Sequence, residues 1–195
     1  MKEFLKKCGT AVKSGAKNML HGTKERWYYW LVILGAILID QFTKWLAVKY
    51  LKPVGSVPLW QGVLHLTYLQ NKGAAFGMLS DRRAVFMVIS ILGLTVFLIY
   101  LFAKKERETL LDIGLAMVIG GGIGNMIDRV ALGYVVDFID FALIDFAIFN
   151  GADSFVCVGA GMMILAMILS IIHESKAQKA AQNEGLSHED DADGR

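Results

Sequence analysis

Long apolar runs limit what this chain can fold into more strongly than any other feature of its sequence. Three runs, at 84–103, 110–127 and 155–172, carry few charges or none, and a fourth at 27–48 is as long but contains two charged residues. Each run is close to the ~20 residues that a helix needs to cross the hydrocarbon core of a bilayer. With 55% hydrophobic and 19% charged residues, the chain is also too apolar for an ordinary soluble domain. The sequence therefore predicts an all-α membrane protein with four transmembrane helices.

The four runs divide the chain into one membrane domain at 27–172 and two tails. In the segment 1–26, apolar residues recur at roughly helical spacing between lysines, which predicts a basic amphipathic helix on the inner leaflet; a frayed tail is equally compatible with the pattern. The segment 173–195 is polar and acidic at its end, which predicts a disordered tail.

The distribution of Lys and Arg predicts the orientation of the chain in the membrane. The segment 1–26, the 104–109 loop and the start of the C-terminal tail carry twelve of these residues, whereas the loops at 49–83 and 129–154 carry six. Because positive charge accumulates on the cytoplasmic side, both termini are expected there. The loops at 49–83 and 129–154 then lie together on the outer side.

Two classes of partner receive no support from the composition. The net charge is only +2, and the charged residues are arranged according to the sides of the membrane. This pattern does not suggest a nucleic-acid partner. Cys8 and Cys157 lie in a tail and in a predicted span, without metal-ligand spacing, and are expected to be plain thiols. Membrane lipids are the partner that the chain requires.

The outer loops contain two extended apolar segments. Residues 64–69 alternate with a period of two and end at the turn residues around Asn71, which predicts a short strand. The segment 134–141 alternates more weakly. Together they predict a small sheet at the membrane surface, shaped to receive an extended peptide.

The first run carries a pair of opposite charges. Asp40 and Lys44 are spaced i, i+4, so they share one helix face and can neutralise one another. Ionisable residues inside a membrane segment are candidates for a functional site. A buried ion pair that fixes helix packing is favoured over direct catalysis for this pair.

The third run ends in a glycine-rich and then polar stretch. Glycines at 120–122 and 124 permit close helix approach. Asn125, Asp128 and Arg129 follow at spacings that place them on one side of a helix. The stretch lies within a span and lacks a preceding strand, so it does not indicate a dinucleotide site.

Four carboxylates are set among apolar residues in the second outer loop: Asp137, Asp140, Asp145 and Asp153. Asp153 directly precedes the fourth run, where a helix dipole stabilises a carboxylate and Asn150 is a suitable N-cap. Asp137 and Asp153 both fall near the outer membrane surface, where the loop can fold back and bring them together. Asp140 and Asp145 are expected to be solvated loop charges.

Two carboxylates held together in a medium of low dielectric cannot both ionise, so one keeps a proton. Such a pair can act as general acid and general base and, with one water, hydrolyse an amide without a metal. Two other functional classes remain open: a proton-coupled transporter that uses Asp40, Lys44 and Asp137 as a relay, and an envelope scaffold that needs no acids. The polar residues cluster at the outer ends of the runs, which favours the hydrolase.

Five short motifs occur in one order along the chain: DQFTKW at 40–45, NKGAAFG at 71–77, GNMIDR at 124–129, VVDF at 135–138 and FNGADS at 149–154. In this order and across four apolar runs, they resemble the motifs of bacterial lipoprotein signal peptidase (signal peptidase II). The resemblance implies an integral aspartyl endopeptidase of the bacterial inner membrane, which needs no cofactor or metal. A monomer is expected, although the sequence carries no signal for the oligomeric state. Such enzymes remove the signal peptide of a prolipoprotein on the amino side of a cysteine that carries diacylglyceryl.

The resemblance also implies roles for individual residues. The catalytic dyad of the family falls on Asp137 and Asp153, near the extracytoplasmic surface. The supporting residues of the family fall on Asp40, Lys44, Asn71, Gly73, Asn125, Arg129, Asn150 and Ala152. Gly151 departs from the pattern, because the family usually has a larger apolar residue there, and the 137–153 connection is short.

Overall fold

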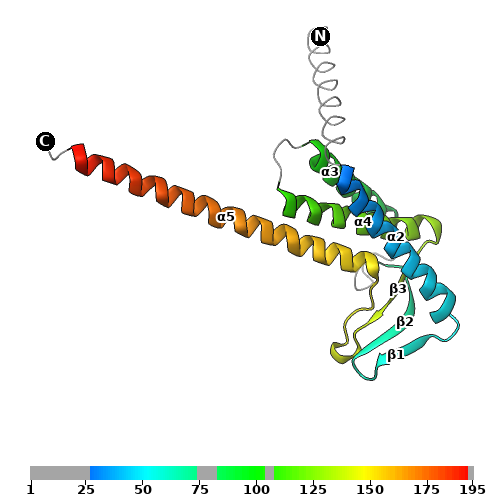
Figure 1. Ribbon diagram of the computed structural model, residues 1–195. Coiled ribbons are helices and arrows are strands. Elements are labelled where there is room, and N and C mark those ends of the chain that lie inside the picture. Colours follow the sequence, from blue (N-terminus) through cyan, green and yellow to red (C-terminus); the bar gives the residue numbers. More distant parts are fainter. Residues whose placement is uncertain (1–26, 74–82, 104–107, 193–195) are drawn as a thin grey trace, which may run out of the picture.

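The computed structural model describes residues 27–73, 83–103 and 108–192. Four α-helices, two short helices of other types and a three-stranded sheet make up this part of the chain (Figure 1). The elements in chain order are α2 (Trp27–Leu46), η1 (Ala47–Leu51), β1 (Ser56–Trp60), β2 (Leu64–Asn71), α3 (Arg83–Ala103), α4 (Thr109–Ala131), β3 (Val135–Asp140), η4 (Ala142–Ile144) and α5 (Gly151–Ala192). The prediction of an amphipathic helix at 1–26 lies outside the described residues.

The apolar runs form helices at the predicted places. Within the described residues, three helices are long and apolar enough to cross a membrane: Trp27–Leu51, Thr109–Ala131 and Gly151–Lys176. Met87–Ala103 is a shorter apolar helix. Their surfaces are largely exposed apolar side chains, with Leu38 and Ile171 each more than 60% exposed, as expected of helices that face lipid.

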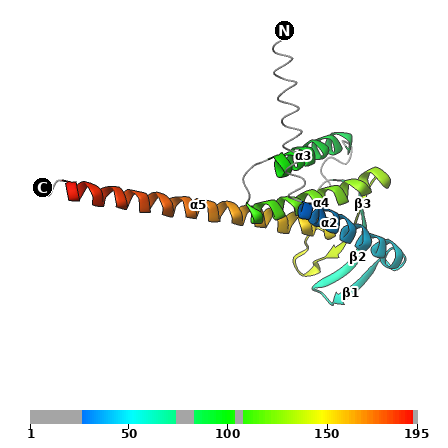
Figure 2. The same ribbon diagram turned by 45° about the horizontal axis from the view of Figure 1, so that its top comes forward.

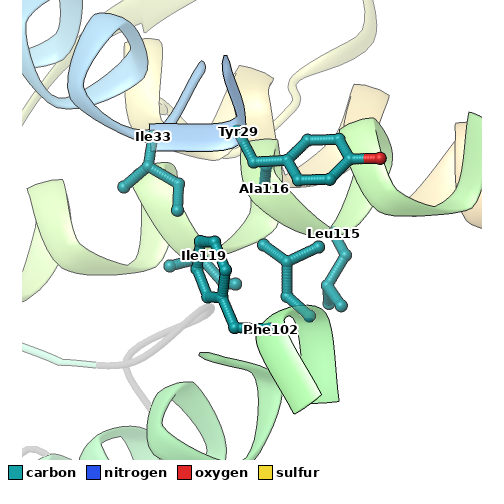
Figure 3. Packing of buried hydrophobic residues seen from close by; sticks show 7 residues of the cluster. Tyr29, Ile33, Phe102, Leu115, Ala116 and Ile119 are labelled. Carbon is teal, nitrogen blue, oxygen red and sulfur yellow. The ribbon is translucent and has the colours of Figure 1, made fainter. Parts of the chain in front are cut away.

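The helices α2, α3 and α4 share one apolar core. Tyr29 and Ile33 from α2 pack against Phe102 from α3 and against Leu115 and Ile119 from α4 (Figure 3). This cluster lies in the half of the bundle that is distant from the sheet, and it holds the helices in register there. Helix α5 packs along α4 and then extends beyond the bundle (Figure 2).

Glycines in α4 allow its neighbours to approach closely, as the sequence predicts. A Cβ atom added at Gly121 would collide with the backbone of α5, and one at Gly124 would lie 2.5 Å from Asp40 Oδ2. Gly120 and Gly122 face α2 and α3 in the same way. Successive glycines therefore let one helix touch three others, because each residue turns the helix face by ~100°.

The sheet is antiparallel in the order β1-β2-β3. The two predicted extended segments form β2 and β3, which confirms the predicted strands. The sheet packs on η1, the short helix that follows α2, where Val136 contacts Ala47 and Leu51. This packing fixes the position of β3 relative to the helices.

Two features differ from the sequence-based expectations. Strand β1 was not predicted: it lies at the edge of the sheet, is exposed along its whole length and contains Pro58, so it carries no alternating pattern. A disordered tail is expected at 173–195, whereas the structure continues α5 as a helix to Ala192. The segment KAQKAAQ at 176–182 consists of strong helix formers, which explains the continuation.

Candidate active site

Asp153 is held at the beginning of α5 by a capping box. Asn150 Oδ1 accepts the backbone N–H of Asp153 at 3.0 Å, and Asp153 Oδ2 accepts the backbone N–H of Asn150 at 3.2 Å. This arrangement satisfies two backbone donors and confirms Asn150 as the N-cap. A capping carboxylate cannot turn freely, so its second oxygen, Oδ1, has a defined direction.

Asp137 is held in β3 and is 1% exposed. It pairs with Leu69 in the antiparallel ladder. Asn71, at the end of β2, donates from Nδ2 to Asp137 Oδ2 at 2.9 Å. The other end of that amide accepts the backbone N–H of Gly73 at 3.0 Å, which fixes which way the amide points.

Two amide side chains connect the two carboxylates. Asn150 Nδ2 donates to Asp137 Oδ1 at 2.6 Å and also lies 3.1 Å from Asn125 Oδ1. Asn125 Nδ2 donates to Asp153 Oδ1 at 2.8 Å. The chain of contacts from Asp137 through Asn150 and Asn125 to Asp153 sets the relative position of the two acids.

The environment of Asp137 disfavours its ionised form. Burial is the largest cause and, with the negative charge of Asp153, raises the pKa of Asp137 from 3.8 to about 6. The hydrogen bonds from Asn71 and Asn150 and the charge of Lys44 act in the opposite direction. A carboxyl group with this pKa can exchange a proton near neutral pH.

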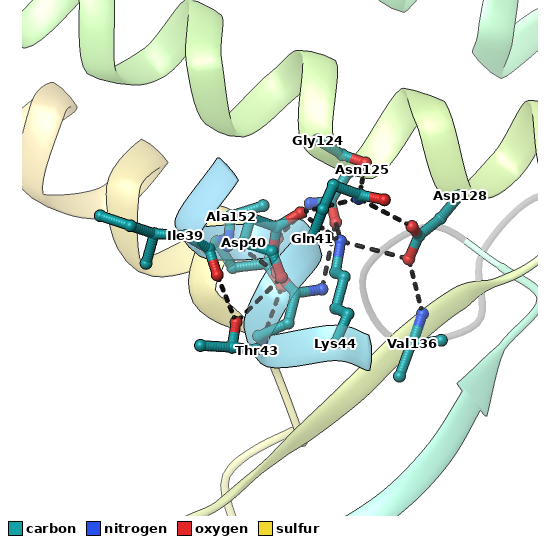
Figure 4. Close-up of polar contacts among 12 residues, drawn as sticks. Ile39, Asp40, Gln41, Thr43, Lys44, Gly124, Asn125, Asp128, Val136 and Ala152 are labelled. Carbon is teal, nitrogen blue, oxygen red and sulfur yellow. Dashed lines mark hydrogen bonds and ion pairs between the residues drawn. The ribbon is translucent and has the colours of Figure 1, made fainter. Parts of the chain in front are cut away.

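A buried ionic network lies behind the two acids (Figure 4). Lys44 Nζ lies 2.8 Å from Asp40 Oδ2 and 3.2 Å from Asp128 Oδ2, and it donates to Asn125 Oδ1 at 2.8 Å. Asp40, Lys44 and Asp128 are each at most 3% exposed. The network makes the Asp40–Lys44 pair a packing element, as the sequence favours, and it also orients Asn125.

The same network holds the first turn of α5. Asp40 Oδ1 accepts the backbone N–H of Ala152 at 2.8 Å, across 112 positions of sequence. Ala152 is fully buried, and its carbonyl oxygen lies against Gly121. A side chain at 121 would therefore collide with the first turn of α5, so this contact requires glycine at 121.

The carboxylates face a cavity of about 540 Å³. Its polar residues are Asn71, Asn125, Arg129, Asp137, Asp153 and Ser154. Its apolar wall contains Val135, Phe141, Ile144, Phe146, Ala147, Ile148 and Phe149, with Cys157 on α5. The rings of Phe141, Phe146 and Phe149 pack on one another and stiffen this wall. The cavity is therefore lined by polar and charged side chains, including both carboxylates, and by an apolar wall.

Arg129 adds positive charge to the cavity. Its Nη1 donates to the backbone oxygen of Asn125 at 3.2 Å, and its guanidinium attracts the charges of Asp153, Asp137 and Asp128. Arg129 projects from the last turn of α4, where a cation is favourable to the helix dipole. In the described part of the chain, no group of three or more His, Cys, Asp or Glu is arranged to hold a metal ion.

The structure brings the sequence-predicted residues together and separates the remaining acids. Asp140 accepts a hydrogen bond of 2.8 Å from Thr67 on the outer part of the sheet, and Asp145 lies in an exposed turn with φ +49°. Neither lines the cavity. Gln41 and Asp128 were not predicted as supporting residues, although both belong to the network. Asp128 follows Asn125 at a helical spacing, which was the available signal; Gln41 lies within the DQFTKW motif but shows no spacing that indicates its partners.

Comparison with known proteins supports one family. The family described as Signal peptidase (SPase) II matches residues 32–169. The lipoprotein signal peptidase of Caldanaerobacter subterraneus is 49% identical over 138 residues, which cover 71% of this chain and 94% of that protein. That of Brevibacillus brevis is 46% identical, with 73% and 95% covered.

A solved structure has the same fold. It is described as a bacterial membrane enzyme structure obtained by the in meso method at 2.3 Å resolution, and it aligns with a TM-score of 0.69 and 32% identity. The alignment covers 75% of this chain and 90% of that one. The family match begins within α2 and ends within α5, and it includes both carboxylates at the cavity. This chain belongs to the signal peptidase II family.

Proposed function

We propose that this protein removes the signal peptide from diacylglyceryl-modified prolipoproteins, by cutting on the amino side of the lipidated cysteine. The observation that carries the proposal is the arrangement of Asp137 and Asp153 at one cavity, connected through Asn125 and Asn150. Membership of the signal peptidase II family supports the substrate class.

The reaction needs one carboxyl group in each protonation state. The ionised carboxylate removes a proton from a water molecule, which attacks the carbonyl carbon of the peptide bond. The protonated carboxyl group gives its proton to the carbonyl oxygen. When the C–N bond then breaks, the carboxyl group that took the proton from water gives it to the leaving amine, and the other carboxylate takes back a proton from the intermediate. The raised pKa of Asp137 supports a pair that shares one proton near neutral pH. Because the two groups titrate together, acid and base are assigned to the pair.

The amides around the pair have a second role in this scheme. Asn71 and Asn150 each direct an N–H group at Asp137 and so keep its oxygens toward the cavity. Arg129 lies in the same cavity and supplies the positive charge that a polarised carbonyl or a lipid headgroup needs. Asn125 fixes Asp153. Preorganised donors of this kind lower the cost of charge development in the transition state.

The membrane topology follows from the same proposal. The four apolar helices cross the bilayer of the bacterial inner membrane, with both termini in the cytoplasm. The sheet and the cavity then lie at the extracytoplasmic surface, where the diacylglyceryl chains of the substrate remain in lipid. The apolar wall of the cavity receives the extended end of the signal segment. We propose a monomer, a form that the arrangement permits, because the side chains that contact the two acids come from the same chain as the acids.

The test uses purified protein in detergent and a synthetic diacylglyceryl prolipopeptide, with products identified by mass spectrometry. The parent is expected to cut immediately before the lipidated cysteine. Asp137→Asn and Asp153→Asn are expected to lose cleavage by at least about 1,000-fold while they remain folded. Asp140→Asn is the matched control, because Asp140 lies on the same strand and outside the cavity. Cleavage at the parent's rate by either active-site variant would refute the assignment; an inactive parent would direct attention to proton-flux assays.

A further inference from the structure

Asp128 has an unusual set of contacts for a residue that does not line the cavity. Its Oδ2 accepts the backbone N–H of Val136 at 3.0 Å and lies 3.2 Å from Lys44 Nζ. Its Oδ1 accepts a hydrogen bond from Gln41 Nε2 at 3.0 Å. A single carboxylate on α4 therefore binds β3 and two residues of α2 (Figure 4).

The contact with Val136 bears directly on Asp137. Val136 is the residue before Asp137, and its backbone N–H points out of the sheet ladder toward Asp128. A β-strand has little freedom over one residue, so fixing the N–H of Val136 fixes the Cα of Asp137. Asp137 also has to reach both Asn71 and Asn150, at 2.9 Å and 2.6 Å.

Gln41 in turn holds Asp128. Its Nε2 lies 3.0 Å from Asp128 Oδ1, 3.2 Å from Asp40 Oδ2 and 3.2 Å from the backbone oxygen of Gly124. The amide therefore connects the carboxylate on α4 with the carboxylate on α2. Without it, each of these acceptors loses a donor in a poorly hydrated region, where an unmade hydrogen bond is costly.

We propose that Asp128 is a positioning residue for the cleavage reaction: it fixes β3 at the residue before Asp137, and Gln41 keeps its carboxylate in place. The inference rests on the proposed function, because it assigns a role in that reaction. A purely electrostatic role is the competing explanation, in which Asp128 only balances the charge of Lys44.

The two explanations predict opposite changes in the pH profile of kcat/KM. The groups that face Asp137 are Asn71 from β2, Asn150 and Asp153 from α5, Arg129 from α4 and Lys44 from α2. The amide hydrogen bonds lower the pKa of Asp137, so a displaced strand that loses them raises it. Removal of the Asp128 charge alone, which leaves Lys44 less neutralised, lowers it. The limb of the pH profile that reports the pKa of Asp137 is therefore expected to move to higher pH if Asp128 positions the strand, and to lower pH if Asp128 only balances charge.

The experiment compares Asp128→Ala, Asp128→Asn and Gln41→Leu with the parent, in detergent, on a diacylglyceryl prolipopeptide. Asp128→Ala is expected to lower kcat by about 100-fold and to move the profile to higher pH, because a misplaced reactive group can cost that factor. Asp128→Asn removes the same charge but keeps an oxygen for the N–H of Val136, so its loss is expected to be nearer about 10-fold. Asp140→Asn, on the same strand, is expected to behave as the parent.

The outcomes are separable. A profile that moves to lower pH, or equal losses in Asp128→Ala and Asp128→Asn, overturns the positioning role in favour of charge balance. If Asp128→Ala does not fold, Gln41→Leu decides, since it keeps the carboxylate and its contact with Lys44; cleavage at the parent's rate with an unmoved profile then overturns the proposal. If the parent itself does not cut, the proposed function fails and this inference falls with it.

Discussion

The side chain of Asn150 donates a hydrogen bond of 2.6 Å to Asp137, so the residue that caps α5 also holds the carboxylate of β3. One side chain thereby couples the beginning of a helix to a strand 13 positions earlier in the sequence. This coupling has a consequence for mutagenesis, because the cap and the carboxylate contact use different atoms of the same amide.

Asn150→Ala and Asn150→Ser are expected to separate the two roles of this residue. Alanine removes both the cap and the donor, so it lowers the unfolding free energy by about 1–2 kcal/mol and lowers kcat by about 100-fold. Serine is a good N-cap but is too short to reach Asp137, so stability returns while cleavage does not. Unfolding in mixed micelles and cleavage assays measure the two effects. A serine variant that cuts at the parent's rate would contradict the role of the donor.

The stability of the protein is expected to depend on pH through Asp137. Its folded pKa is about 6 and its ordinary value is 3.8, so the folded state binds this proton more tightly than the unfolded state. The resulting stabilisation is complete below pH ~4 and is lost as the pH rises through ~6. It amounts to about 1–3 kcal/mol.

Asp137→Asn removes this titration, which makes it the reference protein. The unfolding free energy of the variant minus that of the parent is expected to rise between pH ~4 and ~7. The constant offset from the lost acceptor oxygen does not depend on pH. Unfolding titrations across this range measure the difference, and a difference that is flat with pH is incompatible with the raised pKa.

Gly124→Ala is expected to destabilise the protein and slow cleavage. The added Cβ would lie 2.5 Å from Asp40 Oδ2, which must move and weaken its bond to the N–H of Ala152. Such overpacking costs about 1–3 kcal/mol. Gly35→Ala in α2 is the control, because its Cβ would have no neighbour within 4 Å. It is expected to be neutral or slightly stabilising, since alanine favours helix over glycine. Equal stability of the two variants would argue against the close contact.

Lys44→Met is expected to be strongly destabilising. It leaves Asp40 and Asp128 buried without the cation that both contact. Breaking a buried ion pair from one side costs about 3–5 kcal/mol. The double variant Lys44→Met with Asp40→Asn is expected to regain part of this loss, because one buried charge is removed with its partner. Unfolding measurements on the single and double variants form the test; a single variant as stable as the parent would show that the network contributes little.

The sequence predicted much of the site because its motifs are local. The capping role of Asn150 follows from its place before an apolar run, and the strand at β2 follows from alternation. The Asp40–Lys44 pair follows from i, i+4 spacing on one helix. In each case, the residues that interact are close enough in sequence for helical or strand geometry to relate them.

Helical spacing and strand alternation do not predict which residues of different elements contact one another. The spacing of Asn125, Asp128 and Arg129 placed them on one side of α4, but Asp128 faces α2 and β3 while Arg129 faces the cavity. The edge strand β1 and the role of Gln41 were missed for the same reason: exposure and a partner on another helix leave no periodic signal.

The sequence by itself determined the apolar helices, strands β2 and β3, and the order of motifs that identifies the signal peptidase II family. The physical reason is that crossing lipid requires an apolar run of a certain length, and a strand requires alternation, and both can be read along the chain. Only the tertiary structure decided that Asp137 and Asp153 share a cavity, and that amides and a buried lysine hold them there. The physical reason is that a carboxylate's charge state depends on burial and on neighbours from four different elements, and the packing of those elements is a property of the whole fold.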